Sequence, residues 1–100
     1  MQIIILEEVK SFLLEIGNEN ESRAYKYIGI LSNYGHRLRM PYSKNILPGI
    51  FELRVGGKHN IRIIYTFQNK CAVVFYAFMK KTEQISLKEI NKIKIKYYNL

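Results

Sequence analysis

The chain has 100 residues and a formal net charge of +8, with 48% hydrophobic and 24% charged residues, a composition that argues against a disordered segment. One domain, residues 1–100, accommodates this length, and no apolar run is long enough for a transmembrane helix. The single cysteine, Cys71, leaves no intramolecular disulfide to form, which favours a cytoplasmic protein without a membrane partner.

The first third of the chain predicts a short strand and two helices. Residues 3–6 are compact and β-branched, which is typical of a strand. Apolar residues then recur at helical spacing in residues 9–16 and again in residues 24–31. Gly17 and Gly35 are placed to end these helices. The two helices are expected to form a hairpin that lies over an apolar surface.

The middle of the chain predicts a connection followed by three strands. Residues 36–48 show no clean period and contain two prolines, so they are predicted to form a surface connection. Apolar and polar residues alternate in residues 51–55 and 61–67, as in strands with one covered face. Residues 71–79 are nearly all apolar, which predicts a central strand covered on both sides. The tight connections predict an antiparallel meander.

A capping box predicts where the last helix begins. Ser86 and Glu89 have the S-x-x-E spacing that satisfies the first free amides of a helix. Lys88, Lys92 and Lys96 form one row on that helix, and such like charges destabilise an isolated helix by roughly 0.2–0.5 kcal/mol per pair. Packing of this helix on the sheet, or a bound anionic ligand, must compensate for the repulsion among the three lysines. The predicted fold is α+β, a small antiparallel β-sheet with two N-terminal helices packed on it and a C-terminal helix.

Positive charge is concentrated in the part of the chain that follows residue 22. Residues 1–22 carry a net charge of −4, and residues 23–100 carry +12. A basic face attracts phosphates by Coulomb steering, although the same charge also serves solubility or a ribosomal structural role. All eight acidic residues are glutamates, so a paired-aspartate metal nuclease is excluded, and no metal or cofactor site is predicted.

The side chains best suited to bind a phosphate or to take part in catalysis lie on the predicted strands and at their ends. Arg54 and Arg62 lie on neighbouring strands, and Lys80 and Lys81 close the next one. In a meander these groups can meet in one groove, grip a phosphate and stabilise a phosphorane-like transition state. Tyr65 can stack on an unpaired base or assist proton transfer. The plainer interpretations are a surface ion pair for Arg54, protection of an edge strand by the lysines, and a core position for Tyr65.

Five short segments between residues 37 and 98 occur in order: Met40-Pro41, LPGIFELR at 47–54, IRIIY at 61–65, AFMKKT at 77–82 and KEI at 88–90. In this order, and in this strand and helix context, they resemble the HigB-like branch of the RelE/ParE toxin superfamily. Its members are the toxins of bacterial type II toxin–antitoxin modules.

The resemblance implies an mRNA interferase, an endoribonuclease that cuts transcripts on the translating ribosome. In such toxins the 2′-hydroxyl attacks the adjacent phosphate without metal or cofactor. The resemblance also implies a cognate antitoxin with an acidic segment and a helix-turn-helix DNA-binding domain. The positions that match the catalytic set are Arg54, Arg62, Lys80, Lys81 and Tyr65, and the candidate RNA-binding residues are Arg39, Lys58, Lys88 and Lys92.

Two other functions remain open at this stage. The superfamily contains toxins that inhibit DNA gyrase and share the fold without ribonuclease activity, and the fold alone does not distinguish the two activities. A basic domain can also bind structured RNA or the ribosome with steep salt dependence and never cut it.

Overall fold

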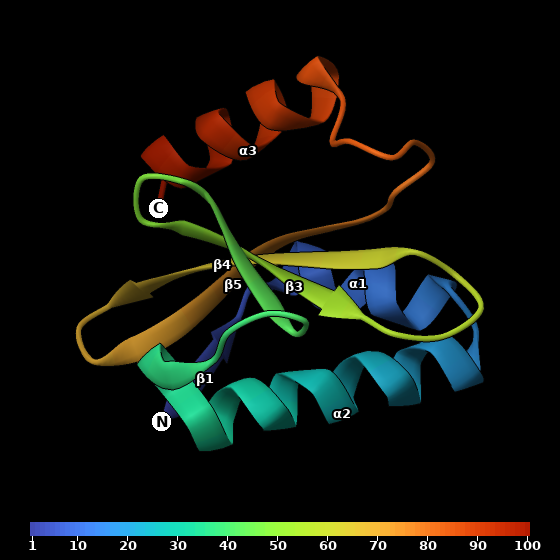
Figure 1. The fold of residues 1–100 in the computed structure, drawn as a ribbon, viewed down its shortest axis with the longest axis horizontal. Coiled ribbons are helices and arrows are strands. Elements are labelled where there is room, and N and C mark those ends of the chain that lie inside the picture. The colour runs from blue at the N-terminus through green and yellow to red at the C-terminus, as the bar shows by residue number, and fades with distance from the viewer.

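The computed structural model describes residues 1–100 and contains a five-stranded sheet with three α-helices (Figure 1). The α+β class and the C-terminal helix are therefore confirmed. None of the helices combines the length and the apolar composition that crossing a membrane requires. The elements in chain order are β1 (Gln2–Ile5), α1 (Glu7–Glu15), α2 (Asn18–Tyr34), the 3-10 helix η1 (Gly35–Arg37), β2 (Ser43–Leu47), β3 (Ile50–Val55), β4 (Ile61–Gln68), β5 (Cys71–Met79) and α3 (Leu87–Tyr98).

The sheet has the strand order β1-β5-β4-β3-β2, and it is mixed rather than antiparallel. Strands β2 to β5 form the expected meander of antiparallel pairs. Strand β1, however, pairs in parallel with β5, with Gln2 opposite Cys71 and Ile5 opposite Val74. The prediction of a purely antiparallel sheet was wrong. Two helices lie between β1 and the meander, and such a long connection can place a strand in parallel, which a tight turn cannot.

Strand β2 lies within the segment that was predicted to be a connection. Ser43 pairs with Leu53 and Lys44 with Glu52, and the register shifts between Asn45 and Leu47. An edge strand with an irregular register has no uniform inner face, so its side chains need not alternate. Backbone pairing with β3, and not a pattern of side chains, therefore defines this strand.

Apolar side chains cover both faces of the sheet. Helices α1 and α2 lie against one face, and α3 lies against the other (Figure 1). The central position of β5, between β1 and β4, agrees with the prediction for residues 71–79. The larger core under α1 and α2 includes the buried residues Leu13, Leu31, Leu53, Ile63 and Tyr65, and the smaller core under α3 consists of the buried residues Ile50, Ile64, Phe75, Phe78 and Ile93.

Helix α3 begins at the predicted cap. The Ser86 side chain accepts a hydrogen bond from the Glu89 backbone amide at 3.2 Å. The Glu89 carboxylate instead accepts a hydrogen bond from the Tyr76 hydroxyl at 2.8 Å, which ties α3 to β5. Burial raises the pKa of Tyr76 above its ordinary range, and the Glu89 contact raises it further. The hydroxyl therefore remains a hydrogen-bond donor at neutral pH.

Replacing Tyr76 by Phe is expected to lower the free energy of unfolding by about 1 kcal/mol, because one hydrogen bond to the C-terminal helix is lost. The ring and its stacking on Phe78, at 5.6 Å between centroids, are retained. Urea denaturation followed by circular dichroism measures the change. Tyr98→Phe is the matched control, since that side chain is 80% exposed and should change nothing. Equal midpoints for the two variants would contradict the anchoring role of Tyr76.

Candidate anion-binding site

One face of the sheet changes from apolar to charged toward the turn between β3 and β4. On this face Ile64 lies opposite Tyr76, whereas Arg62, two residues nearer the turn, lies opposite Arg54. Side chains alternate along each strand, so the register fixes which neighbours share this face. We call five of them the cationic cluster: Lys44 on β2, Glu52 and Arg54 on β3, Arg62 on β4, and Lys80 directly after β5.

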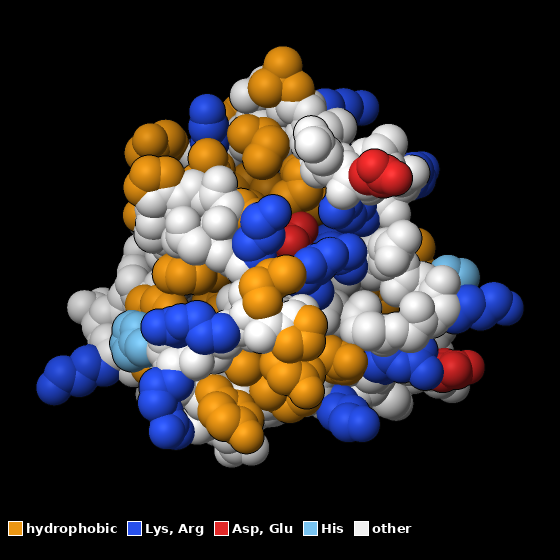
Figure 2. Space-filling model, viewed as in Figure 1, with side chains coloured by type: hydrophobic (Ala, Val, Ile, Leu, Met, Phe, Trp, Pro, Cys, Tyr) orange, Lys and Arg blue, Asp and Glu red, His pale blue; other side chains and the backbone are white.

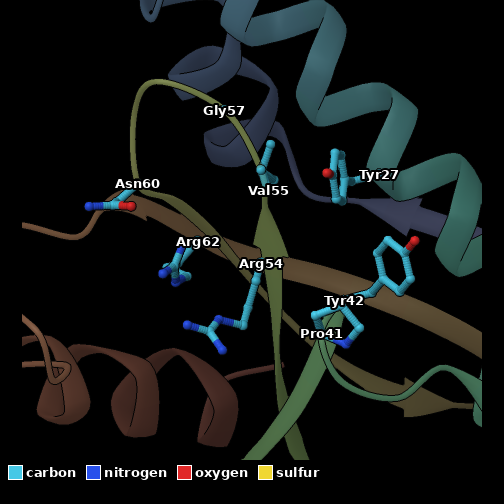
Figure 3. A pocket seen from close by; sticks show the side chains of 9 residues that line it. Tyr27, Pro41, Tyr42, Arg54, Val55, Gly57, Asn60 and Arg62 are labelled. Carbon is cyan, nitrogen blue, oxygen red and sulfur yellow. The ribbon is translucent and has the colours of Figure 1, made fainter.

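The cationic cluster borders two hollows of the surface. One has a volume of about 250 Å³ and is lined by Arg54 and Arg62 among others (Figure 3). The second, of about 290 Å³, is lined by Lys44, Glu52 and Lys80 among others. Figure 2 shows lysine and arginine side chains gathered around one acidic group near the middle of the view. Positive groups thus face solvent on the walls of both hollows.

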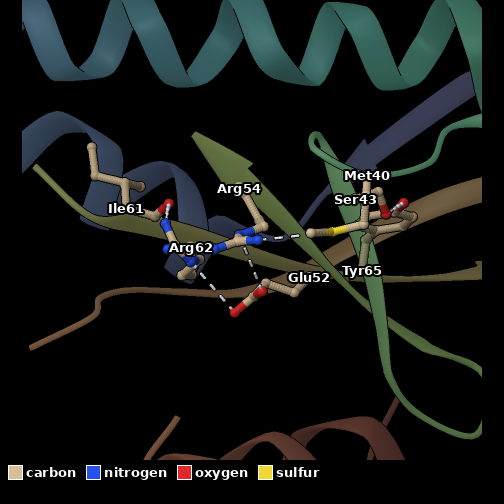
Figure 4. Close-up of polar contacts among 7 residues, drawn as sticks. All are labelled: Met40, Ser43, Glu52, Arg54, Ile61, Arg62 and Tyr65. Carbon is tan, nitrogen blue, oxygen red and sulfur yellow. Dashed lines mark hydrogen bonds and ion pairs between the residues drawn. The ribbon is translucent and has the colours of Figure 1, made fainter. Parts of the chain in front are cut away.

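A single carboxylate holds the two arginines side by side (Figure 4). The Arg62 Nε lies 3.5 Å from Glu52 Oε2, and the Arg54 Nε lies 3.8 Å from Glu52 Oε1. Glu52 is 3% exposed and Arg62 is 6% exposed, whereas Arg54 is half-buried. Neither Arg62 Nε nor Glu52 Oε2 has a hydrogen-bond partner, so their contact is an ion pair without hydrogen-bond alignment. One carboxylate thus faces two guanidinium groups, and a net positive charge remains.

The charges of this site act against one another. Burial lowers the pKa of Arg62, Glu52 raises it in part, and the neighbouring Arg54 lowers it again. Two like charges are therefore held together by the sheet with only one opposing group. A bound anion would relieve this repulsion, because it adds the opposite charge that the pair lacks. The arrangement is suited to a phosphate or another oxyanion.

The structure brings three of the five predicted catalytic residues together, namely Arg54, Arg62 and Lys80. Lys81 is exposed and lines neither hollow of the cluster. Tyr65 does not belong to the cluster either. Its side chain is 1% exposed in the core under α1 and α2, and its hydroxyl hydrogen-bonds to Ser43.

The separation of Tyr65 from Arg62 follows from the strand period. Positions 62 and 65 differ by an odd number, so alternating side chains point to opposite faces of β4. Burial also raises the pKa of the Tyr65 hydroxyl, which makes it a weaker acid. The prediction that Tyr65 shares the site with the arginines was wrong, and it is replaced by a structural role in the core.

The four predicted RNA-binding residues are spread over three parts of the surface. Arg39 precedes β2 and donates to the backbone carbonyls of His36 and Leu38. Lys58 lies in the turn between β3 and β4, and Lys88 and Lys92 lie on α3. Lys92 is 3.9 Å from Glu89, on the same helix. None of the four belongs to the cationic cluster.

Lys44 is the member of the cluster that sequence reasoning missed, and Glu52 was considered from the sequence only as a possible partner of a nearby cation. Lys44 was assigned to a connection because β2 was not predicted. The signal for Glu52 was available in the alternation of β3, where residues 52 and 54 share a face. Recognising their meeting with Arg62 required the cross-strand register.

A known family model matches most of the chain. A model described as phage derived protein Gp49-like (DUF891) matches residues 11–98, which include the second half of α1, all of α2, strands β2 to β5 and α3. Among curated proteins no match was found.

Proposed function

Because the chain belongs to the Gp49-like family, a type II toxin–antitoxin toxin family of the RelE/ParE-like type, we propose that it is a toxin that inhibits translation by cutting messenger RNA on the ribosome. The family is associated with ribonuclease toxins and implies a cognate antitoxin partner. The segments at residues 47–54 and 77–82 support the HigB-like branch within it. The site of action is then the cytoplasm, and the antitoxin carries a helix-turn-helix domain.

The observation that carries this proposal is the cationic cluster. Four cations and one carboxylate stand on one rigid sheet face, and two of the cations are guanidinium groups that can each bind a phosphate through two hydrogen bonds. The charge on a phosphate grows when a nucleophile attacks it. Fixed donors that need no reorganisation stabilise this charge, and stabilisation of this kind is commonly the largest contribution to catalysis.

The reaction that fits these groups is intramolecular transesterification. The 2′-hydroxyl oxygen forms a bond to the adjacent phosphorus, the bond from phosphorus to the 5′-oxygen breaks, and the products are a 2′,3′-cyclic phosphate and a free 5′-hydroxyl. In this proposal Arg54 and Arg62 bind the non-bridging oxygens. The proton of the attacking 2′-hydroxyl passes to solvent water. Lys80, which shares the second hollow with Glu52, donates a proton to the leaving 5′-oxygen.

Induction of the protein in a bacterial host is expected to produce new 5′-hydroxyl ends inside translated transcripts within minutes, while chromosomal DNA stays intact. Ligation-based mapping of 5′-hydroxyl ends measures the first result, and DNA-break and SOS reporters measure the second. The matched control is a reporter transcript whose start codon has been changed, because an untranslated message should remain uncut.

Each competing function predicts a different outcome. Intact transcripts together with DNA breaks would identify a gyrase inhibitor. Growth arrest without new RNA ends and without DNA breaks would identify an RNA-binding or ribosome-binding protein that does not cut.

A further inference from the structure

A pocket lies where β3 runs past the end of β2. The regular pairing of the two strands ends with Ser43 opposite Leu53, and one further bond joins the Arg54 amide to the Tyr42 carbonyl at 2.8 Å. Beyond this bond the edge of β3 is open. The pocket at this edge is the hollow of about 250 Å³ described above.

The two walls of this pocket have different chemistry (Figure 3). Arg54 and Arg62 lie on one side of β3, and Tyr27 from α2 and Tyr42 lie on the other side. The two tyrosine rings are 6.1 Å apart between centroids, and Tyr42 is 40% exposed. An accessible aromatic ring and two guanidinium groups thus border the same small space.

The absence of a side chain at Gly56 allows Tyr27 to pack against the turn after β3. Together, Tyr27 and Tyr42 form what we call the aromatic wall of the pocket. A Cβ atom at position 56 would lie 2.5 Å from the Tyr27 hydroxyl, so no larger residue fits without moving the ring. Tyr27 therefore packs directly on the backbone of the turn after β3. Its ring lies beside Tyr42 at a tilt of 50°, and both rings line the pocket.

We propose that this pocket holds one unpaired base of single-stranded RNA, stacked on Tyr42, while the adjoining phosphate lies on Arg54 and Arg62. The inference rests on the proposed function and adds a base-binding site to it. Every base has an apolar π-face that stacks on aromatic side chains, whereas its phosphate requires cations. The pocket offers both groups next to each other.

An unpaired base fits this site better than a duplex or an acidic peptide. A paired base is stacked on its neighbours and cannot enter a pocket of about 250 Å³. An acidic peptide would satisfy the arginines and the lysines, but its carboxylate side chains have no π-face to stack on Tyr42. A nucleic acid strand supplies further phosphates for these two lysines.

The test is fluorescence anisotropy with two six-nucleotide probes that carry the same 5′ fluorophore. Both have 2′-O-methyl groups so that they cannot be cut, and one of them lacks all bases. Tyr42→Ala is expected to weaken binding of the complete probe about 5- to 150-fold, the range for loss of one base–aromatic stack, and to leave the abasic probe unchanged. Arg54→Ala should weaken binding of both probes and flatten their salt dependence.

Two control variants separate stacking from folding. Tyr42→Phe keeps the ring and should bind both probes as the unmodified protein does. Tyr98→Ala removes an exposed tyrosine on α3, outside the pocket, and should change neither affinity. Thermal unfolding of each variant shows whether it is folded at the assay temperature.

Several results would overturn the base-binding site. Equal affinity of the unmodified protein for the two probes, or an equal loss for both in Tyr42→Ala, would overturn it and leave the phosphate site standing. Loss of both affinities in Tyr42→Phe would assign the residue a structural role instead. If neither probe binds, the site is also overturned, and the mapping of transcript ends then decides separately whether the protein is a nuclease.

Discussion

Replacing Arg54 and Lys80 together by alanine is expected to abolish growth arrest and to slow RNA cleavage by at least about 1,000-fold, with the fold intact. Removing one preorganised donor from a transition-state site lowers the rate by about 100- to 1,000-fold. Neither residue is buried, and Arg62 still pairs with Glu52 in this variant. Stability should therefore change little.

The measurement is cleavage of a defined messenger RNA on purified ribosomes, with circular dichroism melting of the same preparations. Lys81→Ala is the matched control, because this neighbouring lysine is exposed and lines neither hollow of the cluster. It should cleave at the unmodified rate. A double variant that cleaves as fast as the Lys81→Ala control would remove the cationic cluster from the mechanism.

Arg62→Ala is expected to destabilise the protein by about 3–5 kcal/mol, because it leaves a buried carboxylate without its nearest cation. Glu52 is 3% exposed, and its remaining partner Arg54 lies 3.8 Å away and is half-buried. Folded proteins are stable by only about 5–15 kcal/mol. Loss of toxicity in this variant would therefore not distinguish a missing catalytic group from a missing fold.

A paired substitution separates these two explanations. Glu52→Leu combined with Arg62→Met replaces the ion pair by apolar side chains, an exchange that is often neutral or stabilising in other proteins. The double variant is expected to unfold in urea near the unmodified midpoint and yet to be inactive on ribosomes. If Arg62→Ala proves as stable as the unmodified protein, Glu52 is not held by Arg62 in the way that the 3.5 Å contact indicates.

Sequence periodicity was a reliable guide wherever a face is buried. Residues 71–79 were assigned to one central strand, and β5 has these bounds, because a strand covered on both sides must be apolar at nearly every position. The S-x-x-E spacing likewise located the start of α3, since free helix amides demand a polar partner. In both cases the local chemistry and the tertiary position impose the same residue types.

Elements defined by backbone pairing alone were harder to predict. Strand β2 carries no uniform pattern because it is an irregular edge strand, and the direction of β1 depends on a connection that spans two helices. The position of β2 and the direction of β1 depend on which strand edges are free for backbone pairing, and the alternation of apolar and polar side chains does not report this.

The candidate site was predictable in part for the same reason. Arg62 was identified because a charge on a strand with apolar neighbours is costly unless it has a partner or a function, and Arg54 was identified by its place on the neighbouring strand. A pairing of Arg54 with Glu52 was already conceivable from the sequence, but the position of Glu52 between both arginines and the contribution of Lys44 became visible only through the register of β2, β3 and β4. For Tyr65 the residue type suited a catalytic role, but its position on β4 places the side chain on the opposite face of the sheet from Arg62.

The origin of the two pocket walls has a consequence for how such a protein can diversify. The arginines stand on paired strands in the middle of the sheet, whereas the tyrosines come from α2 and from the segment before β2. Mutations at residues 41 and 42 can reshape the aromatic side of the pocket, whereas Met40 is constrained because its Sδ lies 3.8 Å from Arg54 Nη1. If the proposed base-binding site is correct, a library randomised at residues 41 and 42 is expected to yield variants that bind different bases while Arg54 and Arg62 keep their contacts with Glu52.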